Sequence, residues 1–538
     1  MNEFEFSSRR SPVYATRGMV AASQPLAAQA GLDILMGGGN AADAAVATAA
    51  ALNVTEPTST GLGGDMFALF YDASARQVTA LNGSGRAPAA LSLDALKREG
   101  LASALPPFHA HTITVPGACA GWCDLLERHG SRTLADVLAP AIRMAEEGFP
   151  VAPTTAYFWE RGAQRQLATA PGGQELLIEG RAPRAGEIFR NPTLAATLRT
   201  IADQGKTAFY EGEIAEKIVA VVQSRGGLMT LSDLTSHRST WDEPISADYR
   251  GVRVFECPPN GQGLATLLAL NILSSFGPLE NPLSAHDLHL IIESLRLAFA
   301  DTAWYVADPT FATIPLAELL SADYAAERAA RINPNRATLD HARGVPVAAT
   351  DTVYFSVVDG MGNACSFINS NYMGFGTGIV PPGTGFSLQN RGHNFSLQAG
   401  HPNMLAPGKR PYHTIIPALA TYPDRSLYAS FGVMGGFMQP QGHLQVLVAL
   451  RDYGLDPQAA LDLPRVCIED GAAGGGVAVE RGIPTEVVNR LSAMGHPTRQ
   501  VAGFERALFG RGQIIVRMAN GAYCGGSDPR ADGGALGF

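Results

Sequence analysis

The sequence predicts an α+β fold, and two kinds of periodicity support this expectation. Apolar residues recur at helical spacing through much of residues 120–300, for example in Ile214–Val222 and Ala285–Tyr305. Spacing of three to four residues is typical of helices that pack one face on a core. Strand-like alternation marks Met66–Tyr71, its expected partner Gln77–Leu81, and the stretch that follows residue 351.

The composition argues against nucleic-acid-binding, secreted and membrane-spanning proteins. The chain has 538 residues and a net charge of −9, with 46% hydrophobic and 17% charged residues. Its charges are well mixed, so nothing resembles the basic face of a nucleic-acid-binding protein. The first residues lack the apolar core of a secretory signal, and no run of about 18 apolar residues could span a bilayer. We therefore expect a cytoplasmic protein that binds neither nucleic acid nor membrane.

The six cysteines are few and scattered, at positions 119, 123, 257, 365, 467 and 524. They are too few to form a disulfide framework for a chain of this size, which agrees with a reducing compartment. Cys119 and Cys123 lie four residues apart, but no second pair completes a metal site.

Local signals predict several elements in the first half of the chain. Residues 19–36 have the pattern of a strand followed by an amphipathic helix, and Asn40 is a suitable N-cap for a second helix over 41–52. The glycine-rich turn 61–64 leads into the two strands already named, and residues 264–273 predict a further helix.

A polar stretch over residues 330–349 has the character of an exposed connector, and the period changes to two directly after it. Thr352 to Val358 and Ala364 to Ser370 alternate as strands around a loop of five residues. In a hairpin with this loop Val358 faces Ala364, and the same register places Thr352 opposite Ser370. Opposed residues have Cβ atoms about 5 Å apart, so two hydroxyl groups would meet where the connector ends.

This arrangement suits an N-terminal nucleophile. A threonine hydroxyl needs a base, and a free α-amine on the same residue can serve, with an ordinary pKa near 8. An internal threonine acquires that amine only if the chain is cut before it, here between Asp351 and Thr352. Ser370 would then orient the Thr352 hydroxyl.

An oxyanion site is expected near a glycine pair. Residues 426–434 predict a strand, Gly435 and Gly436 end it, and a helix follows over 441–450. Backbone N–H groups of such glycines can stabilise an oxyanion. The ordinary alternative, a plain turn beside a plain strand threonine, stays open from these residues alone.

Motifs along nearly the whole chain resemble those of the γ-glutamyltransferase (glutathione hydrolase) family of N-terminal-nucleophile (Ntn) hydrolase proenzymes. They are Gly37–Ala44, Gly61–Asp65, Thr114–Gly117, Phe209–Gly212, Pro258–Pro259, Tyr305 with Asp308–Pro309, Thr352–Asp359, Phe375–Ile379, Pro407–Pro411, Gly435–Gly436 and Ser527–Arg530. The resemblance implies an αββα sandwich of two stacked antiparallel sheets flanked by helices.

The family's autocleavage would divide the chain into residues 1–351 and 352–538, which stay together as a heterodimer within one αββα unit. The resemblance assigns the nucleophile to Thr352, its hydroxyl partner to Ser370 and the oxyanion donors to Gly435 and Gly436. It implies no cofactor and no metal, and the heterodimer could assemble further into a homo-oligomer.

The substrate pocket departs from the family pattern. The transferases bind the glutamyl carboxylate with an arginine and two serines, and the amine with an aspartate and an asparagine. The arginine position here is Ser84, with Arg86 two residues on. The serine pair becomes His413 and Thr414, the aspartate becomes Asn394, and the asparagine becomes Tyr372.

We expect these five, Arg86, Tyr372, Asn394, His413 and Thr414, to bind a small amide substrate. That substrate could be a γ-glutamyl amide such as glutathione, oxamate, or a longer acyl amide. Both Arg86 and His413 have structural alternatives, an ion pair for the arginine and a hydrogen bond for the histidine.

Two other classes of function remain possible. His109 and His111 form an H-x-H, which hints at a metal-dependent amidohydrolase, and His286 and His289 share a helical face. Neither pair has an evident partner set, so hydrogen-bonded or surface histidines are the simpler interpretation. The chain could also be a non-catalytic binding relative. The sequence does not separate hydrolysis from acyl transfer.

Overall fold

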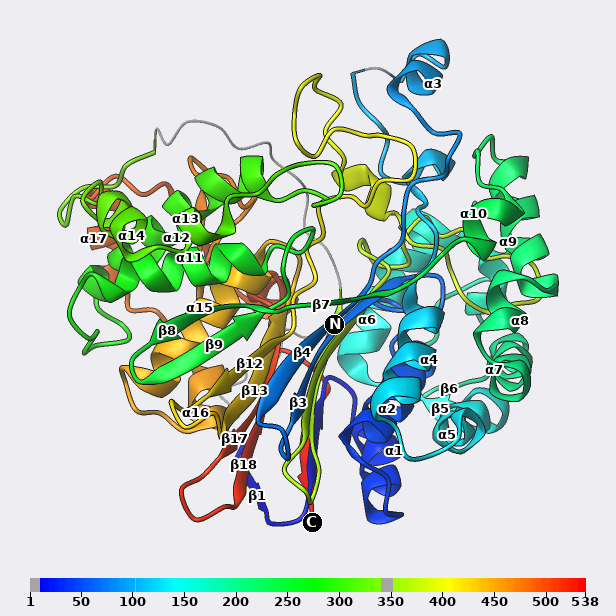
Figure 1. Ribbon diagram of the computed structural model, residues 1–538, viewed down its shortest axis with the longest axis horizontal. Helices are drawn as coiled ribbons and strands as arrows, with labels where there is room; N and C mark the ends of the chain where they lie inside the picture. The colour runs from blue at the N-terminus through cyan, green and yellow to red at the C-terminus, as the bar shows by residue number, and fades with distance from the viewer. Residues whose placement is uncertain (1–9, 102, 340–351) are drawn as a thin grey trace.

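The structure of the protein, a computed structural model, describes residues 10–101, 103–339 and 352–538. Two seven-stranded antiparallel sheets lie face to face, and helices cover the outer face of each (Figure 1). This four-layer arrangement is the αββα sandwich that the family resemblance implied. Asp351 and the later part of the expected connector lie outside the described residues.

The first sheet has the strand order β1-β18-β17-β13-β12-β9-β8. Its strands are β1 (Val13–Ala15), β18 (Tyr523–Ser527), β17 (Arg511–Arg517), β13 (Leu427–Met434), β12 (Ala418–Thr421), β9 (Val252–Glu256) and β8 (Ile245–Tyr249). The strand predicted before Gly435 is β13, near the centre of this sheet.

The second sheet has the order β19-β2-β10-β11-β3-β4-β7. Its strands are β19 (Gly534–Gly537), β2 (Met19–Ala22), β10 (Val353–Val358), β11 (Ala364–Ser370), β3 (Asp65–Asp72), β4 (Gln77–Gly83) and β7 (Thr240–Asp242). Val358 pairs with Ala364, so the hairpin register predicted from the sequence is confirmed. β10 and β11 occupy the centre of the sheet, where every residue of both strands is buried.

Helices form the outer layers. Those against the second sheet are chiefly α1 (Pro25–Met36), α2 (Ala41–Thr55) and α4 (Ala118–His129), and those against the first are α11 (Gly263–Ser274), α15 (Met438–Arg451) and α16 (Pro457–Asp462). α5 (Leu134–Glu147) packs on α2, and α12 (Ala285–Tyr305) packs on α11. A third apolar cluster lies between the sheets and includes Phe67, Tyr354 and Ile515. Apolar surface is buried between each sheet and its helices and also between the two sheets, and this burial stabilises the sandwich.

The remaining helices and strands complete the chain. They are α3 (Leu93–Arg98), α6 (Pro153–Gly162), α7 (Pro192–Gln204), α8 (Lys206–Tyr210), α9 (Glu213–Ser224), α10 (Leu231–Thr235), α13 (Leu316–Leu319), α14 (Ala322–Ala329), α17 (Thr485–Ala493), β5 (Phe149–Pro150), β6 (Ile188–Phe189), β14 (Val466–Ile468), β15 (Val477–Glu480) and β16 (Thr498–Val501). Among the described residues, no helix has both the length and the apolar character needed to cross a bilayer.

Helix α2 shows how local sequence sets these elements. The Asn40 side chain accepts the N–H groups of Ala42 and Asp43, and the Asp43 carboxylate accepts the Asn40 N–H, which forms a capping box. Every residue of α2 is buried, and its alanines allow α1 and the sheet to approach closely. The helix runs to Thr55, three residues beyond the predicted end.

The middle of the chain is less helical than predicted, because β7, β8 and β9 lie within residues 240–256. Each has only three to five residues, and charged side chains interrupt their apolar pattern. Strands this short give little periodicity and form here because a neighbouring strand of the same sheet satisfies their backbone groups.

Candidate functional site

Thr352 and Ser370 meet at the open end of the β10–β11 hairpin. Their side-chain oxygens are 3.0 Å apart, which is a hydrogen bond, and neither residue has measurable exposure. β10 begins at the next residue, Val353, so the rigid sheet fixes the position of the threonine. The Ser370 hydroxyl also accepts the N–H of Tyr372 at 2.9 Å, which orients it toward Thr352.

A buried arginine reaches this hydroxyl pair. Arg391 donates from Nη2 to Ser370 Oγ at 3.2 Å and from Nη1 to Thr414 Oγ1 at 2.6 Å. Its guanidinium carbon lies 4.3 Å from the ring centre of Tyr372, a cation–π contact. Burial lowers the pKa of Arg391 to about 10, and the Asp65 carboxylate opposes that shift. The guanidinium is therefore charged at neutral pH, and its Nε has no hydrogen-bond partner among the described residues.

Asp65 and His413 form a second buried pair. His413 Nε2 is 3.0 Å from Asp65 Oδ2, and Gln389 Nε2 donates to the same oxygen at 3.0 Å. Burial lowers the pKa of His413 well below its ordinary value, helped by the charge of Arg391. Burial raises the pKa of Asp65 to about 7, although Arg391 opposes this shift. The neutral His413 ring is thus held in place by its contact with Asp65.

Tyr372 and Asn394 lie together on the other side of Arg391. The Tyr372 hydroxyl donates to the Asn394 side-chain oxygen, and Asn394 Nδ2 donates to the Tyr412 carbonyl at 3.1 Å. Tyr372 has a φ of 78°, a left-handed conformation that is uncommon for a residue with a Cβ. Strain of this kind concentrates at functional sites and here turns the ring onto the guanidinium.

The glycine pair forms the turn between β13 and α15. Gly435 and Gly436 have φ values of 134° and 60°, which only glycine adopts readily. Gln262 Nε2 donates to the carbonyls of Gly436 at 2.8 Å and of Thr414 at 2.6 Å. Within the described parts of the chain, neither glycine N–H donates a hydrogen bond to another backbone group, and their role as oxyanion donors stays a prediction.

These contacts form one continuous network. It runs from Thr352 through Ser370 and Arg391 to Thr414, and Gln262 then connects Thr414 to the glycine turn. Four of the five predicted substrate-binding residues, Tyr372, Asn394, His413 and Thr414, thus lie in or beside this network, which we call the Arg391 cluster.

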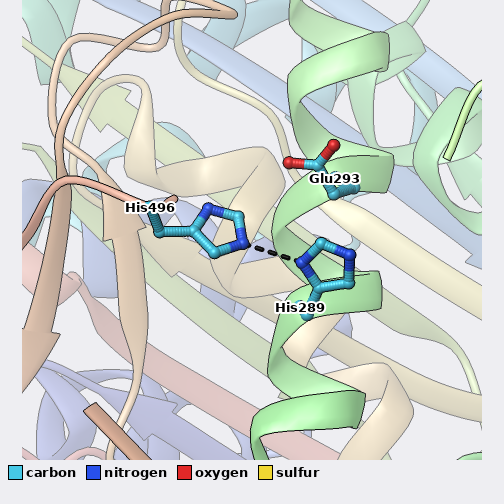
Figure 2. Close-up of side chains that lie close together, drawn as sticks. All are labelled: His289, Glu293 and His496. Carbon is cyan, nitrogen blue, oxygen red and sulfur yellow. Dashed lines mark hydrogen bonds between the residues drawn. The ribbon is translucent and has the colours of Figure 1, made fainter. Parts of the chain in front are cut away.

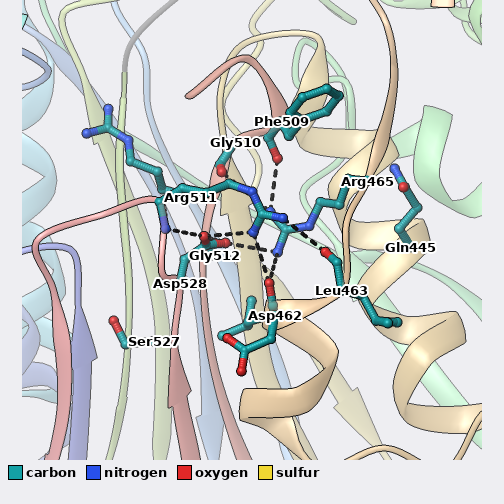
Figure 3. A network of polar contacts seen from close by, with 12 residues as sticks. Gln445, Asp462, Leu463, Arg465, Phe509, Gly510, Arg511, Gly512, Ser527 and Asp528 are labelled. Atoms are coloured by element: carbon teal, nitrogen blue, oxygen red, sulfur yellow. Dashed lines mark hydrogen bonds and ion pairs between the residues drawn. The ribbon is translucent and has the colours of Figure 1, made fainter. Parts of the chain in front are cut away.

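A buried ionic network holds the loop that contains Gly510 (Figure 3). Asp528 pairs with Arg465 at 2.9 Å and accepts the Gly512 N–H at 2.8 Å, and Arg465 donates to the Phe509 carbonyl at 2.9 Å. These bonds fix the loop that contains Gly510. A Cβ on Gly435 would lie 3.2 Å from Gly510 Cα, so the two backbones are in close contact.

Asp528 is ionised in this network. Its burial favours the neutral form, but the charges of Arg465 and Arg530 outweigh that effect and hold its pKa at about 2. Asp528 belongs to the Ser527–Arg530 motif, to which the family resemblance assigned no role. The motif holds the loop that contacts the glycine turn at Gly510.

Arg86 lies apart from the Arg391 cluster. Its side chain is half-buried, and Nη1 donates to the Arg238 carbonyl at 3.4 Å. Arg410 Nη2 donates to the same carbonyl at 3.3 Å. No contact in the described chain joins Arg86 with Thr352 or Arg391, so its substrate-binding role stays a prediction.

Sequence reasoning missed Arg391 and Asp65 as site residues. Arg391 lies in an irregular segment, the 3-10 turn Arg391–Asn394, which has no periodicity to predict where a side chain points. Asp65 carried one usable signal, because it opens a strand directly after a glycine-rich turn. The pairing of β3 with β11 places it opposite Ser370.

The two histidine pairs considered from the sequence have different surroundings in the structure. His111 Nε2 contacts Glu99 at 2.8 Å, and the ring of His109 lies beside that of His111. Within the described residues, neither His109 nor His111 belongs to a group that could hold a metal. Among the described residues, the group with metal-ligand geometry is His289, Glu293 and His496.

Comparison with known proteins agrees with this geometry. The family model for gamma-glutamyltranspeptidase matches residues 27–538. The chain belongs to this family. It is 39% identical over 531 residues to the glutathione hydrolase-like YwrD proenzyme of Bacillus subtilis, a match that covers 98% of this chain and 99% of the relative.

Two further members show the range of the family. The chain is 34% identical to the oxamate amidohydrolase proenzyme of Klebsiella pneumoniae, over 97% of this chain and 99% of that protein. The crystal structure of cephalosporin acylase from Bacillus halodurans superposes with a TM-score of 0.93 at 47% identity, and covers 100% of this chain and 99% of that one. The protein is therefore an Ntn-type amide hydrolase of the gamma-glutamyltranspeptidase family.

Proposed function

We propose that the protein is a proenzyme that cleaves itself between Asp351 and Thr352 and then hydrolyses small amides that carry a carboxylate. The two products, residues 1–351 and 352–538, stay together as a heterodimer. The observation that carries the proposal is the 3.0 Å hydrogen bond between Thr352 and Ser370 at the start of a central strand. The relatives named as proenzymes support processing of this kind.

In the mature enzyme the α-amine of Thr352 accepts the proton of its own hydroxyl, and Oγ1 attacks the amide carbonyl carbon. The N–H groups of Gly435 and Gly436 stabilise the oxyanion. The protonated amine returns its proton to the leaving nitrogen, the C–N bond breaks, and an ester on Thr352 remains. Water then hydrolyses that ester, which releases the acid and restores the hydroxyl.

The position of Arg391 favours a substrate whose carboxylate is close to the scissile carbonyl. Only two hydrogen bonds, of 3.2 and 3.0 Å, separate its guanidinium from the nucleophile oxygen. An arginine binds a carboxylate through paired N–H donors, and Nε of Arg391 is unpartnered. Oxamate, whose carboxylate adjoins the amide carbon, fits this spacing better than a γ-glutamyl amide, in which three carbons intervene.

A longer acyl amide is the second candidate. The 47% identity to the Bacillus halodurans cephalosporin acylase over the whole chain favours it. A relative from Pseudomonas named acylase ACY 1 proenzyme is 34% identical over 98% of this chain. In this alternative Arg391 would maintain the geometry of Ser370 without contacting the substrate.

A panel of three amides separates these possibilities. We expect the fully cleaved protein to hydrolyse oxamate with a higher kcat/KM than either a γ-glutamyl anilide or a longer N-acyl amide. A clear preference for the longer amide would support the acylase alternative. Failure of fully cleaved protein to hydrolyse any of the three would contradict the proposed substrate class.

A further inference from the structure

Two histidines and a glutamate form a buried cluster that shares no residue with the Arg391 cluster. His289 and Glu293 project from the same side of α12 toward His496, which follows the end of α17 (Figure 2). His289 and Glu293 have no exposure, and His496 is 2% exposed. One ligand atom from each lies within 4.8 Å of the other two.

The contacts of His289 fix its tautomer. Its Nε2 lies 2.8 Å from the Asn333 carbonyl oxygen, which can only accept a hydrogen bond. Nε2 therefore carries the proton, and the lone pair of Nδ1 points toward His496 Nε2 at 2.8 Å. Metal-binding histidines commonly donate their second ring N–H to a backbone carbonyl in this way.

One carboxylate oxygen of Glu293 lies near the facing nitrogens of the two histidines. Its Oε2 accepts the Thr338 N–H at 3.0 Å, whereas Oε1 has no hydrogen-bond partner among the described residues. Arg296 Nε is 3.5 Å from Oε1 and balances the charge of the carboxylate. A carboxylate supported by an N–H and a guanidinium is held in place for ligation.

We propose that His289, Glu293 and His496 bind one divalent transition-metal ion of the zinc class. Zn–N bonds of about 2.0–2.1 Å at a tetrahedral angle place two nitrogens about 3.3 Å apart, so the two rings need to separate by only about 0.5 Å. Two imidazoles and one carboxylate favour zinc, cobalt or nickel over magnesium or calcium, which take oxygen ligands. Water can supply a fourth ligand.

The ion would join the two halves of the cleaved protein. His289 and Glu293 precede residue 352, and His496 follows it. The same cluster holds residues 333–338 in place. Asn333 contacts His289, and Thr338 contacts Glu293. The Ala337 N–H also donates to the Met494 carbonyl at 2.7 Å. This bridging role rests on the cleavage proposed above, whereas metal binding does not.

Metal binding is tested on the purified full chain after treatment with a chelator and dialysis against Co²⁺. We expect one Co²⁺ per protein and the visible absorption of a tetrahedral site with nitrogen ligands, in the wild type and in the uncleavable Thr352→Ala variant alike. Absence of bound Co²⁺ from both proteins would overturn the proposal.

Two conservative variants locate the site. A glutamine in His496→Gln can still donate to His289, and one in Glu293→Gln can still accept from Thr338, so both should fold. We expect each to weaken Co²⁺ binding by more than about tenfold. The control is His111→Gln, which changes another buried histidine that contacts a carboxylate, Glu99. Unchanged Co²⁺ affinity in both cluster variants would place the ion elsewhere and overturn the assignment.

The bridging role is tested on the cleaved protein by native mass spectrometry in increasing urea. With Zn²⁺ bound, the two chains should separate at a higher urea concentration than after chelation, and His496→Gln should abolish that difference. Equal separation midpoints with and without Zn²⁺ would overturn the bridge. A chain that never cleaves would instead contradict the proposed processing and leave the Co²⁺ result to decide the metal site.

Discussion

Thr352 and Ser370 face each other across the open end of the β10–β11 hairpin, with their hydroxyl oxygens 3.0 Å apart. Ser370 in turn accepts a hydrogen bond from the buried Arg391. The candidate nucleophile is therefore oriented by a hydroxyl that a fixed positive charge polarises. This relationship joins the self-cleavage that we propose to the substrate recognition that we propose for Arg391.

The Ser370 hydroxyl should accelerate self-cleavage. Loss of one oriented hydrogen bond is worth about 1 kcal/mol, so Ser370→Ala should slow appearance of the two fragments by about fivefold. Ser370→Thr, which keeps the hydroxyl, should cleave at nearly the wild-type rate. The fragments are followed with time by gel electrophoresis.

The matched control for this variant is Ser430→Ala. It removes a hydroxyl that is equally buried but contacts Ser356 in the core between the sheets. Equal rates for Ser370→Ala and the wild type would contradict the orienting role.

Arg391 should set the preference for a charged substrate. Replacement by methionine removes charge-assisted hydrogen bonds of about 1.5–3 kcal/mol, so kcat/KM for oxamate should fall by roughly 10- to 100-fold. The kcat/KM for the neutral analogue oxamide should fall much less. The ratio of the two kcat/KM values, measured by ammonia release from fully cleaved protein, is the diagnostic quantity.

Arg391→Lys provides the control for charge alone, because lysine keeps the charge but not the forked donors. We expect an intermediate ratio for it. An unchanged oxamate-to-oxamide ratio in Arg391→Met would show that the arginine does not recognise the carboxylate.

Gly435 should tolerate no side chain. A Cβ there would meet Gly510 Cα at 3.2 Å, and the φ of 134° is strained for alanine. Gly435→Ala should displace the N–H groups of the turn and lower kcat by about 10²- to 10³-fold, as loss of an oxyanion donor does. Gly454→Ala is a suitable comparison, since that glycine has a φ of 64° and open space around it. Similar kcat values in the two variants would exclude an oxyanion role for the turn.

Asp528 should stabilise the fold in a pH-dependent way. Its folded pKa of about 2 lies below the unfolded value of about 3.9, so its contribution is complete above about pH 4 and disappears as the pH falls toward 2. Asp528→Asn breaks a buried ionic network and should cost on the order of 3 kcal/mol at pH 7. The difference from the parent should shrink as the pH falls from 4 to 2.

Urea unfolding in the Thr352→Ala background, where the chain remains single, measures this difference. Asp424→Asn, at an exposed position, should have little effect at either pH. A difference between Asp528→Asn and its parent that does not change with pH would contradict the assignment of an ionised Asp528.

Local sequence patterns predicted the part of the site that lies on the hairpin, namely the pair Thr352 and Ser370. The period of two and the five-residue loop determine the hairpin register, so the meeting of Thr352 and Ser370 could be derived before the structure. The position of Arg391 depends on how an irregular segment packs against β3 and β11, which no spacing reveals. His289 and His496 are likewise 207 residues apart, and only the fold brings them together.

The most direct test of the central claim is the intact mass and N-terminal sequence of freshly purified protein beside its Thr352→Ala variant. We expect two fragments of 351 and 187 residues in the wild type, with the smaller one beginning Thr-Val-Tyr-Phe, and a single chain of 538 residues in the variant. A wild-type chain that stays whole after long incubation would contradict it, because Thr352 would then lack the amine that activates its hydroxyl.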